Sequence, residues 1–251
     1  MVKGLDVFIN QFEGFSEQYV LIGGTACHIA FDIAGYEFRA TKDLDIVLCA
    51  EALTKEFVDA LLEFIDTGAY EIREKSSGHR QLHRFSKPKR TNYPAMIELF
   101  SRSSGLFPPV ETEALTPIRV EDEVVSLSAI LLDDDYYDWI LRGRDIVQDV
   151  PIVAPEYVIP LKARAWLDLT ERKRAGQTVD TNNIKKHRND VFRLLAIVRP
   201  QELSGVPSTI SADIRAFLDR ATSEAVDYEK LGLGRLASSE VADILRTIYR
   251  A

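Results

Sequence analysis

Apolar positions in the first half of the chain follow two different spacings, which predict a mixture of strands and helices. Residues 18–22, QYVLI, form a short apolar run typical of a strand, and two glycines follow it. Apolar residues at helical spacing then predict a helix beginning with Thr25, for which Gly35 is a stop signal. LDIVLCA at 44–50 is rich in apolar and β-branched residues, so we expect a second strand there.

The same reading extends to the rest of the chain. Leu5, Phe8, Ile9 and Phe12 repeat at helical spacing near the N-terminus. Further helices are expected at 51–68, from Pro155 to 169, at 184–198, near 209–222 and near 238–249, and further strands at 69–73, 80–85, 94–100, 117–120 and 124–127. Residues 171–183 are polar and predict a loop, and residues 128–148 follow no single pattern.

This order of elements predicts an α/β (α+β) fold with two domains. A mixed sheet flanked by helices is expected over residues 1–127, and a mainly helical domain over residues 128–251. No Gly/Ser linker separates the two halves, so we expect them to pack together.

Composition narrows the classes of protein that fit. Among 251 residues, 46% are hydrophobic and the net charge is -8, which argues against non-specific coating of nucleic acid but leaves a local basic groove open. No stretch approaches the roughly 20 apolar residues of a membrane span. The first residues lack the apolar core of a signal peptide, so we expect a cytoplasmic protein. Cys27 and Cys49 form no CxxC pair and are expected to be buried free thiols.

The acidic residues Asp43 and Asp45 open the strand expected at 44–50. Residues i and i+2 of a strand point to the same face, so the two carboxylates should lie side by side. A divalent cation would relieve their repulsion, and oxygen ligands suit Mg²⁺. Taken alone, however, a D-x-D motif is common.

Glu98 is a third candidate carboxylate. It lies in the apolar run PAMIELF, where an unpaired buried glutamate would be costly. Together with Asp43 and Asp45 it could hold two metal ions about 3.5–4 Å apart, as in two-metal phosphoryl transfer. Alternatively, Glu98 is half-exposed at a sheet edge or paired with an arginine.

Gly23 and Gly24 connect the first strand to the helix that follows. Glycine lets a backbone approach a ligand closely, and the N–H groups at a helix start favour phosphate. Thr25 could cap this helix or contact the phosphate. The alternative is a tight turn with no ligand, since the motif is neither GxGxxG nor a P-loop.

The order of these motifs resembles the nucleotidyltransferase superfamily that includes DNA polymerase beta. In that order, a strand leads through Gly-Gly into a helix, a D-x-D motif opens the next strand, and a later strand carries a further acid. Within this superfamily, LIGGTACHIAF and RATKDLDIVL look most like the AbiEii-type abortive-infection and toxin nucleotidyltransferases. The resemblance implies Mg²⁺ as cofactor, with two ions expected and Mn²⁺ as a substitute, and an NTP as substrate. Gly23 and Gly24 then match the phosphate-binding glycines, Asp43 and Asp45 the metal ligands, and Glu98 the third carboxylate, which often activates the attacking hydroxyl.

The resemblance also points to two residues in the second half. Lys162 in IPLKARAWLDL looks like the family's lysine, and Asp190 in KKHRNDVFRL looks like its late aspartate. Helical spacing places Lys162 beside an apolar face, where it could meet a triphosphate or simply lie along its own stem. Asp190 could instead form a surface ion pair with Lys186.

Basic residues near the motifs are candidates for contacts with phosphate. Arg39 and its neighbours Thr41 and Lys42 precede the acidic pair and could bind phosphate or neutralise the carboxylates. The basic runs at 86–90 and 171–174 are expected in loops, where they are solvated or contact an RNA or nucleotide acceptor.

Rival functions use similar acids in a different order. In haloacid-dehalogenase-type phosphatases and many sugar transferases the acidic pair follows an apolar strand, whereas Asp43 and Asp45 precede one. The second rival is a catalytically silent protein that binds a nucleotide or a partner on the same fold. The favoured reading is an Mg²⁺-dependent transfer of a nucleotidyl group to a hydroxyl of an RNA or tRNA end, a protein or a small molecule. A toxin function would add an antitoxin partner.

Overall fold

The chain divides into two compact units. The computed structural model describes residues 2–74, 80–102, 115–120, 123–221 and 226–251. Unit 1 is Met1–Ala154 and unit 2 is Pro155–Ala251. This division lies further along the chain than the expected one after residue 127, because two strands, β8 (Arg144–Val147) and β9 (Val150–Val153), return to the sheet of unit 1.

Unit 1 is built on a mixed sheet, which confirms the expected α+β class. Its other strands are β1 (Tyr19–Ile22), β2 (Asp43–Leu48), β3 (Glu71–Glu74), β4 (Arg80–Ser86), β5 (Met96–Ser101), β6 (Leu115–Val120) and β7 (Glu123–Leu131). Among the described residues the strand order is β3-β4-β5-β2-β1-β9-β8, with β7 paired to β5 and β6. The strand β2 is antiparallel to β1 and parallel to β5, so the N-terminal ends of β2 and β5 lie at the same edge.

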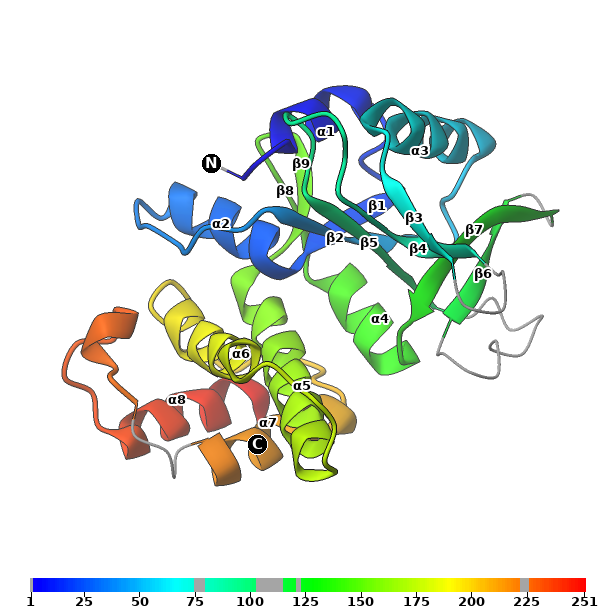
Figure 1. Cartoon of the computed structure of the whole chain (residues 1–251). Coiled ribbons are helices and arrows are strands. Elements are labelled where there is room, and N and C mark those ends of the chain that lie inside the picture. The colour runs from blue at the N-terminus through cyan, green and yellow to red at the C-terminus, as the bar shows by residue number, and fades with distance from the viewer. Residues whose placement is uncertain (1, 75–79, 103–114, 121–122, 222–225) are drawn as a thin grey trace. The chain divides into compact units, whose positions relative to one another are not determined.

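Helices cover both faces of this sheet. Those of unit 1 are α1 (Leu5–Gln11), α2 (Gly23–Ile33), α3 (Lys55–Gly68) and α4 (Asp134–Arg142). Figure 1 shows α1 and α3 on one face and α4 on the other. Phe8 of α1, Phe12 directly after α1 and Phe57 of α3 meet the ring of Tyr19 on β1 in aromatic contacts, which anchors the two helices to their face.

Strand alternation separates an apolar face from a polar one. Ile46 and Leu48 of β2 share the face of Tyr19, which pairs with Leu48 in register, and all three are buried. The intervening residues Asp43 and Asp45 therefore lie on the opposite face, away from α1 and α3. They are only partly buried.

Several helix boundaries differ from expectation, and two of them have a clear physical reason. α3 begins at Lys55 rather than at residue 51, because the side chain of Thr54 accepts a hydrogen bond from the backbone N–H of Phe57 at 3.3 Å and caps the helix. α5 (Pro155–Arg174) runs to Arg174, so the basic run at 171–174 forms its last helical turn and was wrongly expected in a loop. Cations at that position interact favourably with the helix dipole.

Unit 2 is helical. It contains α5, α6 (Thr181–Leu194), α7 (Ser208–Ala221), the short 3₁₀ helix η1 (Glu229–Leu231) and α8 (Ser238–Tyr249). α5 packs against α6 and α7, as Figure 1 illustrates. Trp166 and Phe192 both contact the ring of Phe217, which places an aromatic core between these three helices.

A proline inside α5 is accommodated by a side chain from α8. Pro160 has no N–H, so it cannot donate to the carbonyl of Glu156 four residues earlier. The hydroxyl of Tyr249, which is buried, donates to that carbonyl at 2.5 Å instead. Burial raises the pKa of Tyr249, so the hydroxyl keeps its proton. This contact joins the start of α5 to the end of α8.

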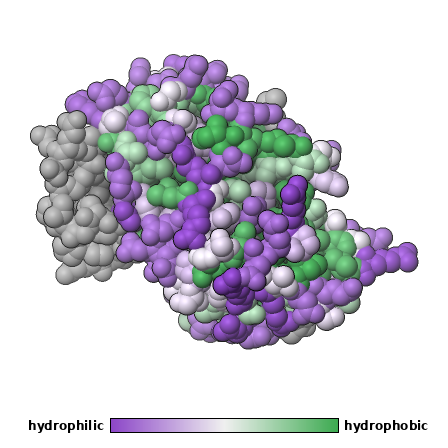
Figure 2. All heavy atoms as spheres, turned by 180° about the vertical axis from the view of Figure 1, so that it is seen from behind, coloured by the Kyte–Doolittle hydropathy of each residue, from purple (hydrophilic) through white to green (hydrophobic). Residues whose placement is uncertain are grey.

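Figure 2 shows the polarity of one face of the described surface. Hydrophilic side chains cover most of the face in Figure 2, with hydrophobic ones interspersed. The large hydrophobic side chains exposed among the described residues are Ile33, Tyr36 and Ile146. None of the described helices has the length and apolar character needed to cross a membrane. Cys27 and Cys49 are buried free thiols, as expected.

Candidate active site

Asp43 and Asp45 occupy the first and third positions of β2. Their side chains share one face of the strand, as the period of two predicts. β2 lies between β1 and β5, where Asp45 is in register with Ile22 on one side and with Glu98 on the other. The strand pairing therefore brings the three predicted carboxylates to one face of the sheet, near the N-terminal ends of β2 and β5.

Glu98 lies in the interior of the sheet, with Arg84 of β4 as its partner. β5 pairs with both β2 and β4, so Glu98 is not on an edge strand. Arg84 is opposite Glu98 in the antiparallel register, and both its Nε and its Nη2 contact Oε1 of Glu98. Of the alternatives for Glu98, the structure thus shows the arginine pair.

The two glycines make room for the side chains of the acidic segment. Gly23 has a φ of +66°, and a Cβ at this position would overlap the carboxylate of Asp45. A Cβ on Gly24 would lie 2.7 Å from Oγ1 of Thr41. Both positions therefore need glycine for close approach, and the Gly-Gly turn is packed directly against the segment that carries Asp43 and Asp45.

Thr25 holds this turn to β2. Its side chain is fully buried, and its hydroxyl donates to the backbone carbonyl of Asp43 at 3.0 Å. The residue at the N-cap of α2 is Ile22, and no side chain caps the helix, so the expectation of a Thr25 cap is wrong. The hydroxyl instead fixes the distance between the start of α2 and the start of β2.

The segment before β2 carries the basic residues. The guanidinium of Arg39 lies 5.2 Å from the centre of the Phe38 ring, and Arg39 is partly exposed. Lys42 is exposed, and its backbone carbonyl accepts a hydrogen bond from the N–H of Ala95 at 2.8 Å. This bond ties the segment to residues just before β5 and so aligns the ends of both strands.

The acidic pair supplies the type of oxygen ligand that Mg²⁺ binds in proteins. Carboxylate oxygens from one or two residues, completed by water and substrate phosphates, are its usual ligands, and Asp43 and Asp45 supply such a pair. Within the described part of the chain, no three His, Cys, Asp or Glu side chains are grouped closely enough to hold a metal ion. Glu98 fits by its register, but its side chain is engaged by Arg84.

Lys162 and Asp190 are paired with one another in unit 2. Lys162 on α5 and Asp190 on α6 are both buried, and Nζ of Lys162 lies 3.7 Å from Oδ2 of Asp190. Arg193, one turn further along α6, lies 3.9 Å from the other carboxylate oxygen. A surface ion pair between Asp190 and Lys186 was the wrong alternative, because Asp190 has no exposed surface.

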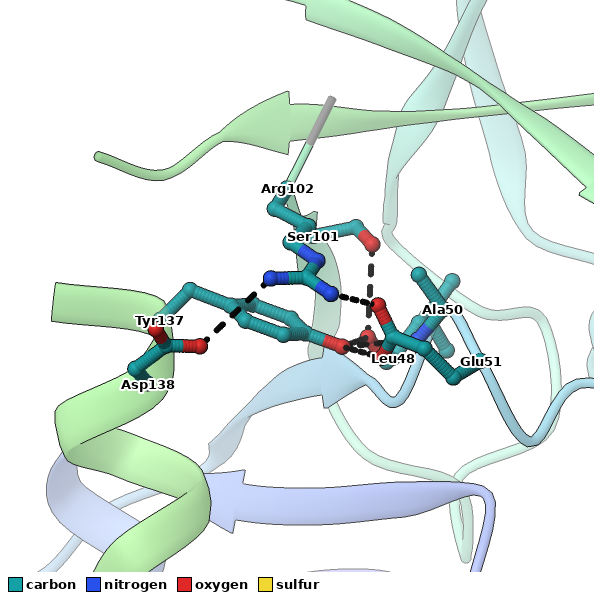
Figure 3. Close-up of polar contacts among 7 residues, drawn as sticks. All are labelled: Leu48, Ala50, Glu51, Ser101, Arg102, Tyr137 and Asp138. Carbon is teal, nitrogen blue, oxygen red and sulfur yellow. Dashed lines mark hydrogen bonds and ion pairs between the residues drawn. The ribbon is translucent and has the colours of Figure 1, made fainter. Parts of the chain in front are cut away.

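A second polar network lies at the opposite ends of β2 and β5 (Figure 3). The hydroxyl of Tyr137 on α4 accepts from the N–H of Ala50 at 2.8 Å and donates to Glu51 at 2.9 Å. Arg102 forms an ion pair with Glu51, and its guanidinium lies 4.9 Å from the centre of the Tyr137 ring. Burial raises the pKa of Tyr137, which remains a donor. These contacts anchor α4 to the sheet at the strand ends opposite the acidic pair.

Fold and site together define a class of protein. A strand, a close-packed Gly-Gly turn, a helix and an acidic strand, placed on a mixed sheet, are the arrangement for which a nucleotidyltransferase was expected. The family model described as "Nucleotidyl transferase AbiEii toxin, Type IV TA system" matches residues 8–249. The chain belongs to the AbiEii nucleotidyltransferase toxin family. No curated protein gives a significant match.

Arg84 is the residue of the site that the sequence did not single out. It lies in the strand expected at 80–85, and Glu98 lies in the strand expected at 94–100. An antiparallel pairing of these two strands would have suggested that Arg84 and Glu98 are neighbours. The register between them, however, also depends on the conformation of the connecting residues 87–95, which the sequence pattern does not specify.

Proposed function

We propose that this protein transfers a nucleotidyl group from an NTP to a hydroxyl acceptor in an Mg²⁺-dependent reaction. The observation that carries the proposal is the packing of Gly23 against Asp45, because it places a phosphate-compatible turn beside a cation-compatible acidic pair. Membership of the AbiEii family supports the same reaction class.

The acidic residues would bind the metal ion and orient the attacking hydroxyl. Asp43 and Asp45 would bind the cation, and Glu98 would serve as the third carboxylate that orients the attacking hydroxyl. A bound divalent cation supplies Lewis-acid stabilisation of the charge that develops on the transferred group. Thr25, through its hydrogen bond to the Asp43 carbonyl, keeps the acidic pair in place.

The backbone and the basic residues would bind the phosphates of the NTP. N–H groups at the start of α2 are free of side-chain caps and suit an anion. Arg39, partly exposed and four residues before Asp43, is placed in sequence to add a guanidinium. As the family resemblance implies, we further propose a phosphate-binding role for Lys162, which is paired with Asp190 in unit 2.

The family description also implies a biological partner. The matched family model describes toxins of type IV toxin–antitoxin systems. We therefore propose that this protein is the toxin of such a pair and that a cognate antitoxin counteracts it. The acceptor would then be a cellular RNA end, a protein or a small molecule whose modification harms growth.

The proposal is tested by following label from the nucleotide. The protein is incubated with each α-labelled NTP, Mg²⁺ and a cell extract, and the products are treated with nuclease or protease to classify the acceptor. Transfer is expected for the wild type and lost in Asp43→Asn/Asp45→Asn. Asp66→Asn, at an exposed position of α3, is the matched control and should transfer normally. Absence of transfer would favour the catalytically silent alternative, and absence of Mg²⁺ and nucleotide binding as well would favour the form of it that binds only a partner.

A further inference from the structure

Three charged side chains lie in one row across neighbouring strands. Asp45 on β2 is in register with Glu98 on β5, and Glu98 is in register with Arg84 on β4. Cross-strand neighbours share a face, and in an antiparallel pair such as Arg84 and Glu98 their Cβ atoms lie about 4.5–5.5 Å apart. The row therefore contains two carboxylates side by side, with a cation beyond the second of them.

The contact between Arg84 and Glu98 is stronger than an ordinary surface ion pair. Only 14% of the Glu98 side chain and 39% of the Arg84 side chain are exposed. Two guanidinium N–H groups, Nε and Nη2, reach the same carboxylate oxygen, Oε1. Charge-assisted bonds of this kind in a partly desolvated place are about twice as strong as neutral hydrogen bonds.

This contact accounts for a discrepancy at the site. Strand register brings the three carboxylates to one face, and yet no three acidic groups of the described chain gather as a metal-binding set. Arg84 supplies Glu98 with a fixed positive charge, since a guanidinium does not deprotonate in proteins. A cation arriving at Asp43 and Asp45 must therefore compete with Arg84 for Glu98.

We propose that Arg84 is a positioning residue, which holds Glu98 apart from the acidic pair until a phosphate group takes over its guanidinium. The inference rests on the proposed function, because it assigns that phosphate to the bound NTP. Carboxylate and phosphate are bound by the same planar set of N–H donors, so the exchange of partners needs no new kind of contact. Once released, Glu98 completes the set of three carboxylates.

The first test asks whether Arg84 keeps Glu98 away from the metal site when no nucleotide is bound. It measures Mn²⁺ binding to the full chain without nucleotide by electron paramagnetic resonance. Asp45→Asn should weaken binding by about tenfold or more, whereas Glu98→Gln should change it by less than about twofold, because Glu98 is not yet a ligand. Arg84→Gln should strengthen binding by about fivefold, because it releases a carboxylate next to the site. The double variant Arg84→Gln/Glu98→Gln should lose this gain.

The same measurement with a non-hydrolysable NTP analogue tests the exchange. Glu98→Gln should now weaken Mn²⁺ binding by about fivefold or more, because the analogue's phosphates have displaced Arg84 from Glu98. Lys55→Gln is the matched control, since it removes another cation of unit 1 that is paired with a carboxylate, Asp59, and it should change nothing. Arg84→Lys, which keeps the charge, should bind Mn²⁺ like the wild type and guards against a fold defect in Arg84→Gln.

Two results would overturn the assignment of Arg84. One is that Glu98→Gln weakens Mn²⁺ binding as much as Asp45→Asn when nucleotide is absent. The other is that Arg84→Gln, with an unchanged circular dichroism spectrum, binds Mn²⁺ like the wild type. The measurement contains no acceptor and no transfer step. Failure of the proposed reaction would therefore appear as missing label transfer with this binding pattern intact.

Discussion

At the scale of single residues, Gly23 connects backbone conformation to the geometry of the acidic pair. Gly23→Ala should lower stability by about 1 kcal/mol because of its left-handed φ, and it should also displace Asp45 and abolish nucleotidyl transfer. Gly14→Ala is the matched control, since Gly14 has a φ of +86° but nothing within 4 Å of an added Cβ. Thermal unfolding and label transfer should show similar destabilisation in both variants and lost transfer only in Gly23→Ala.

Substitutions of the buried pair Lys162 and Asp190 can distinguish a structural role of the pair from a catalytic role of Lys162. Lys162→Met or Asp190→Leu alone should lower the free energy of unfolding by about 3 kcal/mol, because each leaves a buried charge without its main partner. The double variant should recover most of this loss in urea denaturation, since an apolar pair needs no compensation. If Lys162 also contacts phosphate, transfer should stay low in the double variant. Recovery of both stability and transfer would contradict a catalytic role.

The position of a side chain could be predicted from sequence where it depends on the geometry of a single strand. The period of two was enough to put Asp43 and Asp45 on the same face of one strand. Arg84 was not predictable, because its importance comes from the register between β4 and β5. Nor was the burial of Asp190, because it depends on how α6 packs against α5.

At the scale of elements, the Pro160–Tyr249 arrangement joins the ends of α5 and α8. Tyr249→Phe should lower stability by about 1 kcal/mol, because the Glu156 carbonyl loses the hydrogen bond from the Tyr249 hydroxyl. In a Pro160→Ala background the same change should cost less, since residue 160 then has an N–H for that carbonyl. A double-mutant cycle by urea denaturation measures the coupling, and additive effects of the two changes would contradict the account.

The second polar network, which joins α4 to the sheet, should make the stability of the protein depend on pH in the acidic range. Burial alone would raise the pKa of Glu51, but hydrogen bonds from the backbone and from Tyr137, together with Arg102, hold it below its usual value of 4.5. A lowered folded-state pKa contributes stability above about pH 4.5 that is lost as the pH falls through the folded pKa. Glu51 is half exposed, so the contribution should be under about 1 kcal/mol.

Urea denaturation of the wild type and of Glu51→Gln, from neutral pH to below about pH 4.5, measures the contribution of the Glu51 charge to stability. Glutamine keeps an oxygen that can accept from Tyr137 but lacks the charge. The wild type should be the more stable protein at neutral pH, and the difference should shrink below about pH 4.5. A difference that stays constant into acid would show that the charge of Glu51 contributes nothing.

Elements with a clear apolar pattern were predicted well, and elements whose pattern is interrupted were not. The strand at 18–22 and the helices of unit 2 were expected near their observed positions. β8 and β9 were missed, although β1 of the same length was predicted, because charged residues interrupt the apolar run of β8 and Pro151 lies within β9. Their return to the sheet also moved the division between the units.

At the scale of the whole molecule, the fold class and the family could be predicted while the reaction partners could not. The order of motifs along the chain carried the resemblance, and a family match over residues 8–249 confirms it. The identity of the acceptor depends on surface shape and charge, for which no local sequence pattern exists. A net charge of -8 argues only that any nucleic-acid contact is confined to a local basic region.

The central claim is that the Asp43–Asp45 site transfers a nucleotidyl group rather than a phosphoryl group. The most direct measurement compares one NTP labelled at the α-phosphate with the same NTP labelled at the γ-phosphate, in extract supplied with Mg²⁺. The account predicts that α-label enters an acceptor while γ-label leaves as pyrophosphate, and that both outcomes disappear in Asp43→Asn/Asp45→Asn. γ-Label in the acceptor, or α-label transfer that persists without the two aspartates, would contradict it.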